Sequence, residues 1–76
     1  MRPIHPDYPK LIKEIRRQLG LSQEDLAREL GVSYATVNRW ENRLSRPSKL
    51  ARAQLDAFCE RMQSTGMLTI PEASRG

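Results

Sequence analysis

Residue types that support catalysis or metal binding are scarce in this sequence. Its 76 residues include one cysteine, one histidine and one tryptophan. A single cysteine, Cys59, excludes an intramolecular disulfide and a thiolate zinc cluster, and a single histidine, His5, argues against a histidine metal site or catalytic triad. The sequence also lacks a glycine-rich phosphate loop, and no nucleophile has a base placed near it. We therefore expect no enzymatic activity, no metal and no cofactor.

Long apolar runs are also missing. No stretch approaches the roughly 20 apolar residues that a membrane-spanning helix needs, and the N-terminus has no signal-peptide core. The sequence predicts a cytoplasmic protein without a membrane segment. Its length allows one domain at most, with a small core and modest stability unless it dimerises.

Positive charge is in moderate excess. Thirteen lysines and arginines stand against nine acidic residues, which gives a net charge of +4. This excess favours an anionic partner, although it can equally serve solubility until the charges are placed on one face.

Helical spacing is clearest in the central stretch, residues 21–43. Leu26, Ala27 and Leu30 form one face of a first helix, and Val37 and Trp40, three residues apart, form one face of a second. A small side chain at Ala27 lets the two helices approach closely. The spacing of Trp40 indicates a core residue rather than a stacking platform.

Residues typical of helix ends and helix starts lie between and before these two helices. Gly31 stands where the first must end, because glycine adopts φ > 0 at little cost, and Ser33 is a candidate N-cap for the second. Ser22 and Asp25 fit the capping-box pattern at the start of the first helix. The stretch therefore predicts two short helices joined by a tight turn.

Two further helices flank this pair, one from Pro9 to about Gly20 and one from about Ser48 to Met62. We divide the chain into an extended N-terminal arm (1–8), a domain (9–63, central motif 22–42) and a flexible C-terminal tail (64–76). The arm is either frayed or a nucleic-acid contact, and residues 67–70 either form a loosely packed tail or touch a partner chain. The expected core comprises Leu11, Ile12, Ile15, Leu19, Leu26, Leu30, Val37, Trp40, Leu50, Ala51, Leu55, Phe58, Cys59 and Met62.

From Leu11 to about Met62 the chain resembles the phage-repressor (Cro and C1-like, XRE-like) helix-turn-helix family of transcriptional regulators. The resemblance rests on Gln23, Ala27, Gly31, Val37 and the run Trp40-Glu41-Asn42. It implies an all-α, compact, lambda-repressor-like DNA-binding domain of four helices, or five. It also implies a structural ion pair, because family members pair an arginine, here Arg16, with the glutamate that is Glu41 here.

The same resemblance places the second helix of the motif, about Tyr34 to Asn42, in the major groove of DNA. Its outward residues are the predicted base readers. Arg39 suits guanine or a phosphate, Asn38 suits adenine, and Ala35 or the edge of Tyr34 suits a thymine methyl group. Several family members have glutamine at the position of Tyr34. The predicted base readers are Tyr34, Ala35, Asn38 and Arg39.

Phosphate contacts are predicted around this helix. Gln23 lies in a helical first turn, where free N–H groups favour anions, while Ser33 and Thr36 either bind phosphate or cap a helix. Arg43 replaces the usual glycine of the family; if φ > 0 is required there, the strain costs about 1 kcal/mol, and otherwise the loop takes another shape. The predicted phosphate contacts are Gln23, Ser33, Thr36, Asn42, Arg43, Arg46 and Lys49.

Taken together, these features predict a sequence-specific regulator that binds double-stranded DNA, most simply a nucleoid-associated repressor of phage, plasmid or toxin–antitoxin type. A homodimer would bind two half-sites roughly 34 Å apart. The alternative is a protein-interaction or DNA-targeting module of a larger assembly, including an antitoxin component. A basic stripe over the motif supports the first function, and an apolar patch there supports the second.

Overall fold

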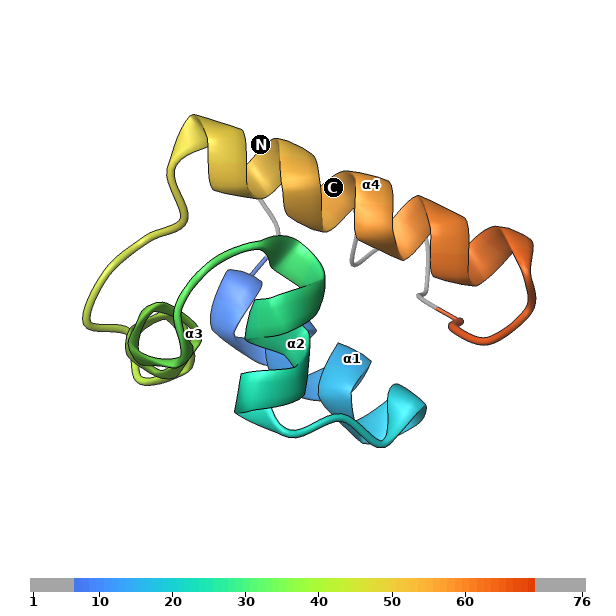
Figure 1. Cartoon of the computed structure of the whole chain (residues 1–76), viewed down its shortest axis with the longest axis horizontal. Helices are drawn as coiled ribbons and strands as arrows, with labels where there is room; N and C mark the ends of the chain where they lie inside the picture. The colour runs from blue at the N-terminus through green and yellow to red at the C-terminus, as the bar shows by residue number, and fades with distance from the viewer. Residues whose placement is uncertain (1–6, 70–76) are drawn as a thin grey trace, which may run out of the picture.

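A computed structural model describes residues 7–69, which form four helices and no strand. The helices are α1 (Tyr8–Leu19), α2 (Gln23–Leu30), α3 (Tyr34–Glu41) and α4 (Lys49–Ser64). In Figure 1, α4 lies across one side of the other three helices, and α2 and α3 cross at a steep angle. The predicted all-α, four-helix fold is confirmed. Residues 1–6 of the predicted arm and 70–76 of the predicted tail lie outside the described residues.

The turns and caps of the helix pair follow from a few side chains. At the start of α2, the Asp25 amide donates to Ser22 Oγ (2.9 Å) and the Ser22 amide donates to the Asp25 carboxylate (3.0 Å), so the predicted capping box is complete. Gly31 ends α2 at φ +74°, and Ser33 Oγ accepts the Thr36 amide at 3.1 Å as the N-cap of α3. Both predictions are confirmed, so the path from α2 into α3 is encoded locally.

All four helices contribute to the core. Trp40 is 3% exposed, which confirms its predicted place in the core. The prediction that Leu50 lies in the core is wrong, because its side chain is 73% exposed. It lies in the first turn of α4, next to buried Ala51 and about 100° around the helix from it, so it points to solvent. The buried apolar residues are Ile12, Ile15, Leu26, Ala27, Leu30, Val37, Trp40, Ala51, Leu55, Phe58, Cys59 and Leu68.

The segment after α4 packs more closely than the expected loose tail. Gly66 adopts φ +78° and turns the chain back, so that the Met67 amide donates to the Met62 carbonyl at 2.9 Å. Leu68 then inserts into the core and is 3% exposed. Thr69 is held by Gln18 of α1, whose side-chain amide accepts from the Thr69 N–H and donates to the Thr69 C=O, both at 2.9 Å. Residues 66–69 therefore pack back against the core and against α1.

Candidate nucleic-acid interface

The outer face of α3 is open to solvent. Its inner face is fixed by Val37 and Trp40, which are buried against the rest of the core. On the outer face, Tyr34 is 52% exposed, and Ala35 and Arg39 are also exposed. Within residues 7–69 these three side chains make no hydrogen bond or ion pair, so they are available to a partner.

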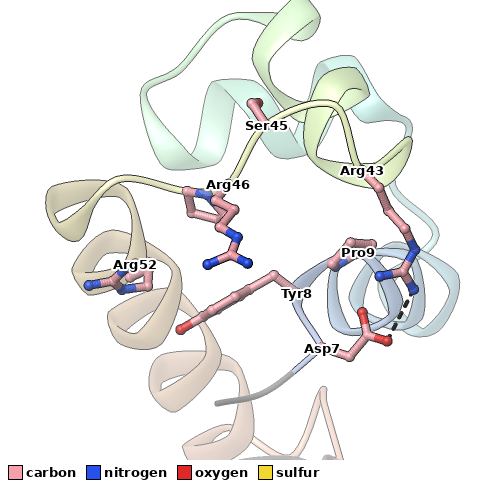
Figure 2. Close-up of a pocket in the computed structure, with 8 residues that line it drawn as sticks. Asp7, Tyr8, Pro9, Arg43, Ser45, Arg46 and Arg52 are labelled. Carbon is pink, nitrogen blue, oxygen red and sulfur yellow. Dashed lines mark hydrogen bonds and ion pairs between the residues drawn. The ribbon is translucent and has the colours of Figure 1, made fainter.

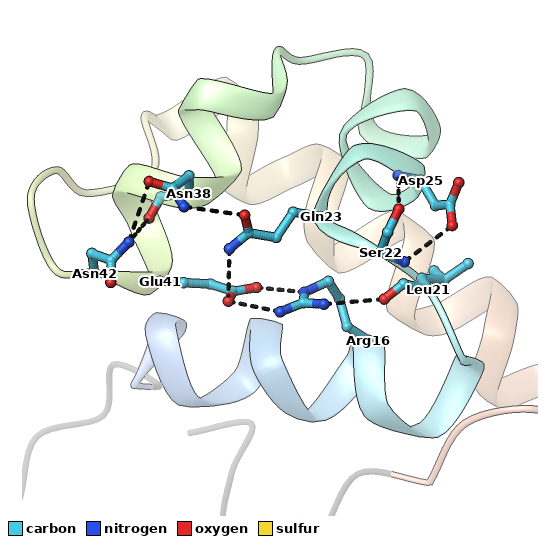
Figure 3. A network of polar contacts seen from close by, with 8 residues as sticks. All are labelled: Arg16, Leu21, Ser22, Gln23, Asp25, Asn38, Glu41 and Asn42. Carbon is cyan, nitrogen blue, oxygen red and sulfur yellow. Dashed lines mark hydrogen bonds and ion pairs between the residues drawn. The ribbon is translucent and has the colours of Figure 1, made fainter.

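Behind this face lies a partly buried ion pair between Arg16 of α1 and Glu41 at the end of α3 (Figure 3). Arg16 Nε donates to Glu41 Oε2 at 2.6 Å and Arg16 Nη2 donates to Oε1 at 2.9 Å, a two-pronged contact that suits the planar guanidinium. Arg16 Nη1 also donates to the Leu21 carbonyl at 3.1 Å. Glu41 is 5% exposed, so this pair, predicted from the family resemblance, links α1 to α3 in the interior.

The ionised state of Glu41 depends on these partners. Burial opposes ionisation, but hydrogen bonds from Arg16 and Gln23 and the positive charges of Arg16 and Lys13 outweigh it and hold the pKa of Glu41 below its usual value. In turn, the hydrogen bond to Glu41 raises the pKa of Arg16. Both groups are therefore charged near neutral pH.

Three side-chain amides extend this pair to the surface of α3. Gln23 Nε2 donates to Glu41 Oε1 at 3.0 Å, and Asn38 Nδ2 donates to Gln23 Oε1 at 3.1 Å. Asn42 Nδ2 donates to the carbonyl of Asn38 at 2.8 Å. Since an ionised carboxylate only accepts, the Gln23 NH₂ group must face Glu41 and its oxygen must face Asn38. We call these five residues, Arg16, Gln23, Asn38, Glu41 and Asn42, the polar network.

The loop after α3 is pinned to the start of α1. Arg43 adopts φ +61°, so the position does require a left-handed backbone, and an arginine bears a strain of about 1 kcal/mol there. Its guanidinium donates to the carboxylate of Asp7, the N-cap of α1, at 3.1 Å. Arg46 and Lys49 are exposed. Arg46 points toward Tyr8, into a cavity (Figure 2).

Comparison with known proteins identifies the family. A sequence model described as helix-turn-helix matches residues 12–51, just over half of the 76 residues. The chain belongs to the XRE-like helix-turn-helix family. It is 49% identical over 37 residues to proteins named "Uncharacterized HTH-type transcriptional regulator YiaG" from Escherichia coli K12 and Escherichia coli O157:H7. The alignment covers 49% of this chain and 38% of each relative, so well under half of the relatives' length is matched. No solved structure matches the chain significantly.

Within this helix-turn-helix chain, Ser33 is the N-cap of α3, and the Thr36 hydroxyl in the first turn hydrogen-bonds to it. Their hydroxyl oxygens lie 2.9 Å apart, and Ser33 Oγ also accepts the Thr36 amide. Ser33 is exposed at the start of α3.

Two residues that line the cavity beside Arg46 are not among the site residues predicted from the sequence. Asp7 ahead of a Tyr-Pro pair fits an N-cap followed by an early helical proline, and that signal could have identified it. Arg52 on α4 carried no such signal, because only the folded loop brings it to the cavity that Arg46 faces.

Residues 7–69 hold neither a membrane-spanning helix nor a cluster of metal ligands. None of the helices in this range has the length and apolar character needed to cross a membrane. In the same residues, no group of three or more His, Cys, Asp or Glu side chains is arranged to hold a metal ion.

Proposed function

We propose that this helix-turn-helix chain is a sequence-specific transcriptional repressor that inserts α3 into the major groove of double-stranded DNA. The proposal rests on the outer face of α3, where Tyr34, Ala35 and Arg39 are exposed and have no partner within residues 7–69. The major groove is about 12 Å wide and admits one α-helix, whose side chains then reach the base edges.

Base reading falls to the free side chains of α3. Arg39 suits the O6 and N7 atoms of guanine, and Ala35 and the edge of Tyr34 suit a thymine methyl group. Asn38 is half-buried, donates one amide hydrogen to Gln23 and accepts from Asn42 at 3.3 Å, so in our proposal it reads a base with its second amide hydrogen and the second lone pair of its side-chain oxygen.

The proposed contacts with the DNA backbone come from residues at the edges of the outer face of α3 and in the loop that follows it. Gln23 and Asn42 stand on either side of Asn38 with fixed amides, which favours phosphate binding because little side-chain freedom is lost. Ser33, Thr36, Arg43, Arg46 and Lys49 complete the proposed phosphate set. The net charge of +4 supports attraction to DNA.

A homodimer is the proposed form on DNA, acting on the nucleoid in the cytoplasm. Leu44 and Leu50, at 69% and 73% exposure, provide apolar surface near the ends of the loop between α3 and α4, where a second copy would bury it. Two copies would place their α3 helices roughly 34 Å apart, one turn of DNA.

Repeated selection from a pool of random duplexes tests this function, at a salt concentration that suppresses non-specific phosphate binding. We expect an enriched palindrome, lost in Arg39→Ala and retained in the control Arg17→Ala, which removes an exposed cation of α1. A single short site would show a monomeric reader or a module of a larger assembly. No enrichment by the folded protein would refute DNA reading and favour a protein-interaction module.

A further inference from the structure

An open cavity of about 460 Å³ lies between the start of α1, the loop after α3 and α4 (Figure 2). Its lining includes the side chains of Arg43, Arg46 and Arg52, together with Tyr8 and Asp7. We infer that this cavity is a binding site for a phosphate group, distinct from the exposed face of α3.

The charge of the lining is the first reason. Three arginines meet one acidic side chain, and that acid is already neutralised, because Asp7 accepts from Arg43 at 3.1 Å. This hydrogen bond also lowers the pKa of Asp7. The side chains of Arg46 and Arg52 make no hydrogen bond or ion pair within residues 7–69. Two cations therefore line the cavity without an acid bonded to them in the described part of the chain; the Asp56 carboxylate near Tyr8 is not part of the lining.

The arrangement of donors is the second reason. Tyr8 extends from α1 toward α4, with the guanidinium groups of Arg46 and Arg52 beside it (Figure 2). Burial and the nearby charge of Asp56 raise the pKa of the Tyr8 phenol, so it stays protonated and can donate. Guanidinium forks match the oxygens of phosphate in geometry and charge, and a phenol adds a directional donor.

The walls of the cavity are held in place without a ligand. Pro47 is buried and fixes the far end of the loop, while the Arg43–Asp7 pair ties its near end to α1. The volume exceeds that of a bare phosphate and leaves space for an attached group. The phosphate can therefore come from a small phosphorylated molecule or from the backbone of a bound duplex.

Titration of the full chain with inorganic phosphate tests the site, at constant ionic strength maintained with chloride, by ¹H–¹⁵N NMR of arginine Nε–H and backbone amides. We expect saturable shifts at Arg46, Arg52 and residues 43–47. Arg52→Gln should weaken binding about three- to tenfold. Tyr8→Phe should also weaken it, because the phenol donor is lost. The control Arg61→Gln, which removes the same charge from an exposed site farther along α4, should leave it unchanged.

Shifts that do not saturate, or that fall equally in Arg61→Gln and Arg52→Gln, would overturn the inference. A second titration with duplex DNA separates the two sources. If the duplex displaces inorganic phosphate and shifts Arg52, the site takes a backbone phosphate; if phosphate still binds to the DNA complex, it serves a small molecule. The first titration contains no DNA, so it can succeed even if DNA reading by α3 is refuted.

Discussion

Replacing Arg16 by methionine removes its ion pair with Glu41, together with the hydrogen bond from Arg16 Nη1 to the Leu21 carbonyl. Methionine keeps an unbranched side chain but removes the charge and both Arg16 donors to Glu41, which is only 5% exposed and keeps the hydrogen bond from Gln23. An unpaired buried carboxylate costs roughly 3 to 5 kcal/mol. The Arg16 side chain is 25% exposed, so water compensates part of this cost and we expect a loss of about 2 to 3 kcal/mol. For a chain of 76 residues, total stability is about 4 to 11 kcal/mol.

The loss should depend on pH in a defined direction. In the wild type the pKa of Glu41 lies below its usual value of 4.5, so its stabilising effect is present above pH 4.5 and is lost as the pH falls through the lowered pKa. In Arg16→Met, burial is no longer outweighed and the pKa of Glu41 rises. The difference between the two proteins should therefore be large at pH 7 and shrink on acidification toward pH 4, because the variant loses the buried charge of Glu41 at a higher pH than the wild type does.

Circular dichroism at 222 nm during thermal and urea unfolding, from pH 7 to pH 4, measures this difference. The melting temperature at pH 7 should fall by about 10 to 20 °C. Arg17→Met is the matched control, because Arg17 is the next residue and forms a pair with Glu14 in which both side chains are exposed. Equal melting temperatures for the two variants, or a difference that does not shrink on acidification, would refute the proposed role of the pair.

Three further predictions concern the interface. Arg39→Ala should weaken binding to a selected duplex by about 1 to 3 kcal/mol and relax the base preference. Arg46→Ala should instead weaken binding to all duplexes alike and reduce the slope of log K against log salt concentration by about one unit. Fluorescence anisotropy with labelled duplexes measures both effects. In a double-mutant cycle, Asn38→Ala and Gln23→Ala should be coupled by more than about 0.5 kcal/mol in DNA binding, because the Asn38 amide donates to the Gln23 oxygen and orients it. Additive losses of binding free energy would contradict this. Arg43→Gly should be neutral or stabilising by up to about 1 kcal/mol in urea unfolding, because it relieves the φ of +61°, and a clear loss would show that the Asp7 pair matters more.

Features set by local sequence were predicted well. The capping box of Ser22 and Asp25, the glycine turn at Gly31 and the burial of Trp40 all depend on spacing within one or two helical turns, and all three are present. The pairing of Arg16 with Glu41, 25 residues apart, came from the family resemblance and not from spacing.

Features set by three-dimensional packing were not predictable in the same way. Leu50 fits the helical period of α4 but lies at the edge of its apolar stripe, where only the position of neighbouring elements decides exposure. Leu68 follows an irregular segment, and its burial depends on the turn at Gly66. The hydrogen bond between Gln23 and Asn38 depends on rotamers on two helices, which composition and period do not specify.

The polar network separates the positions that hold the fold from those that remain free. Gln23, Asn38 and Glu41 each satisfy a neighbour, so a change at any of them disturbs another. The side chains of Tyr34 and Arg39 are exposed and make no hydrogen bond or ion pair within residues 7–69. Natural mutation or a designed library can therefore vary these two positions on an unchanged fold. New binding preferences can then arise without compensating substitutions in the core or the polar network.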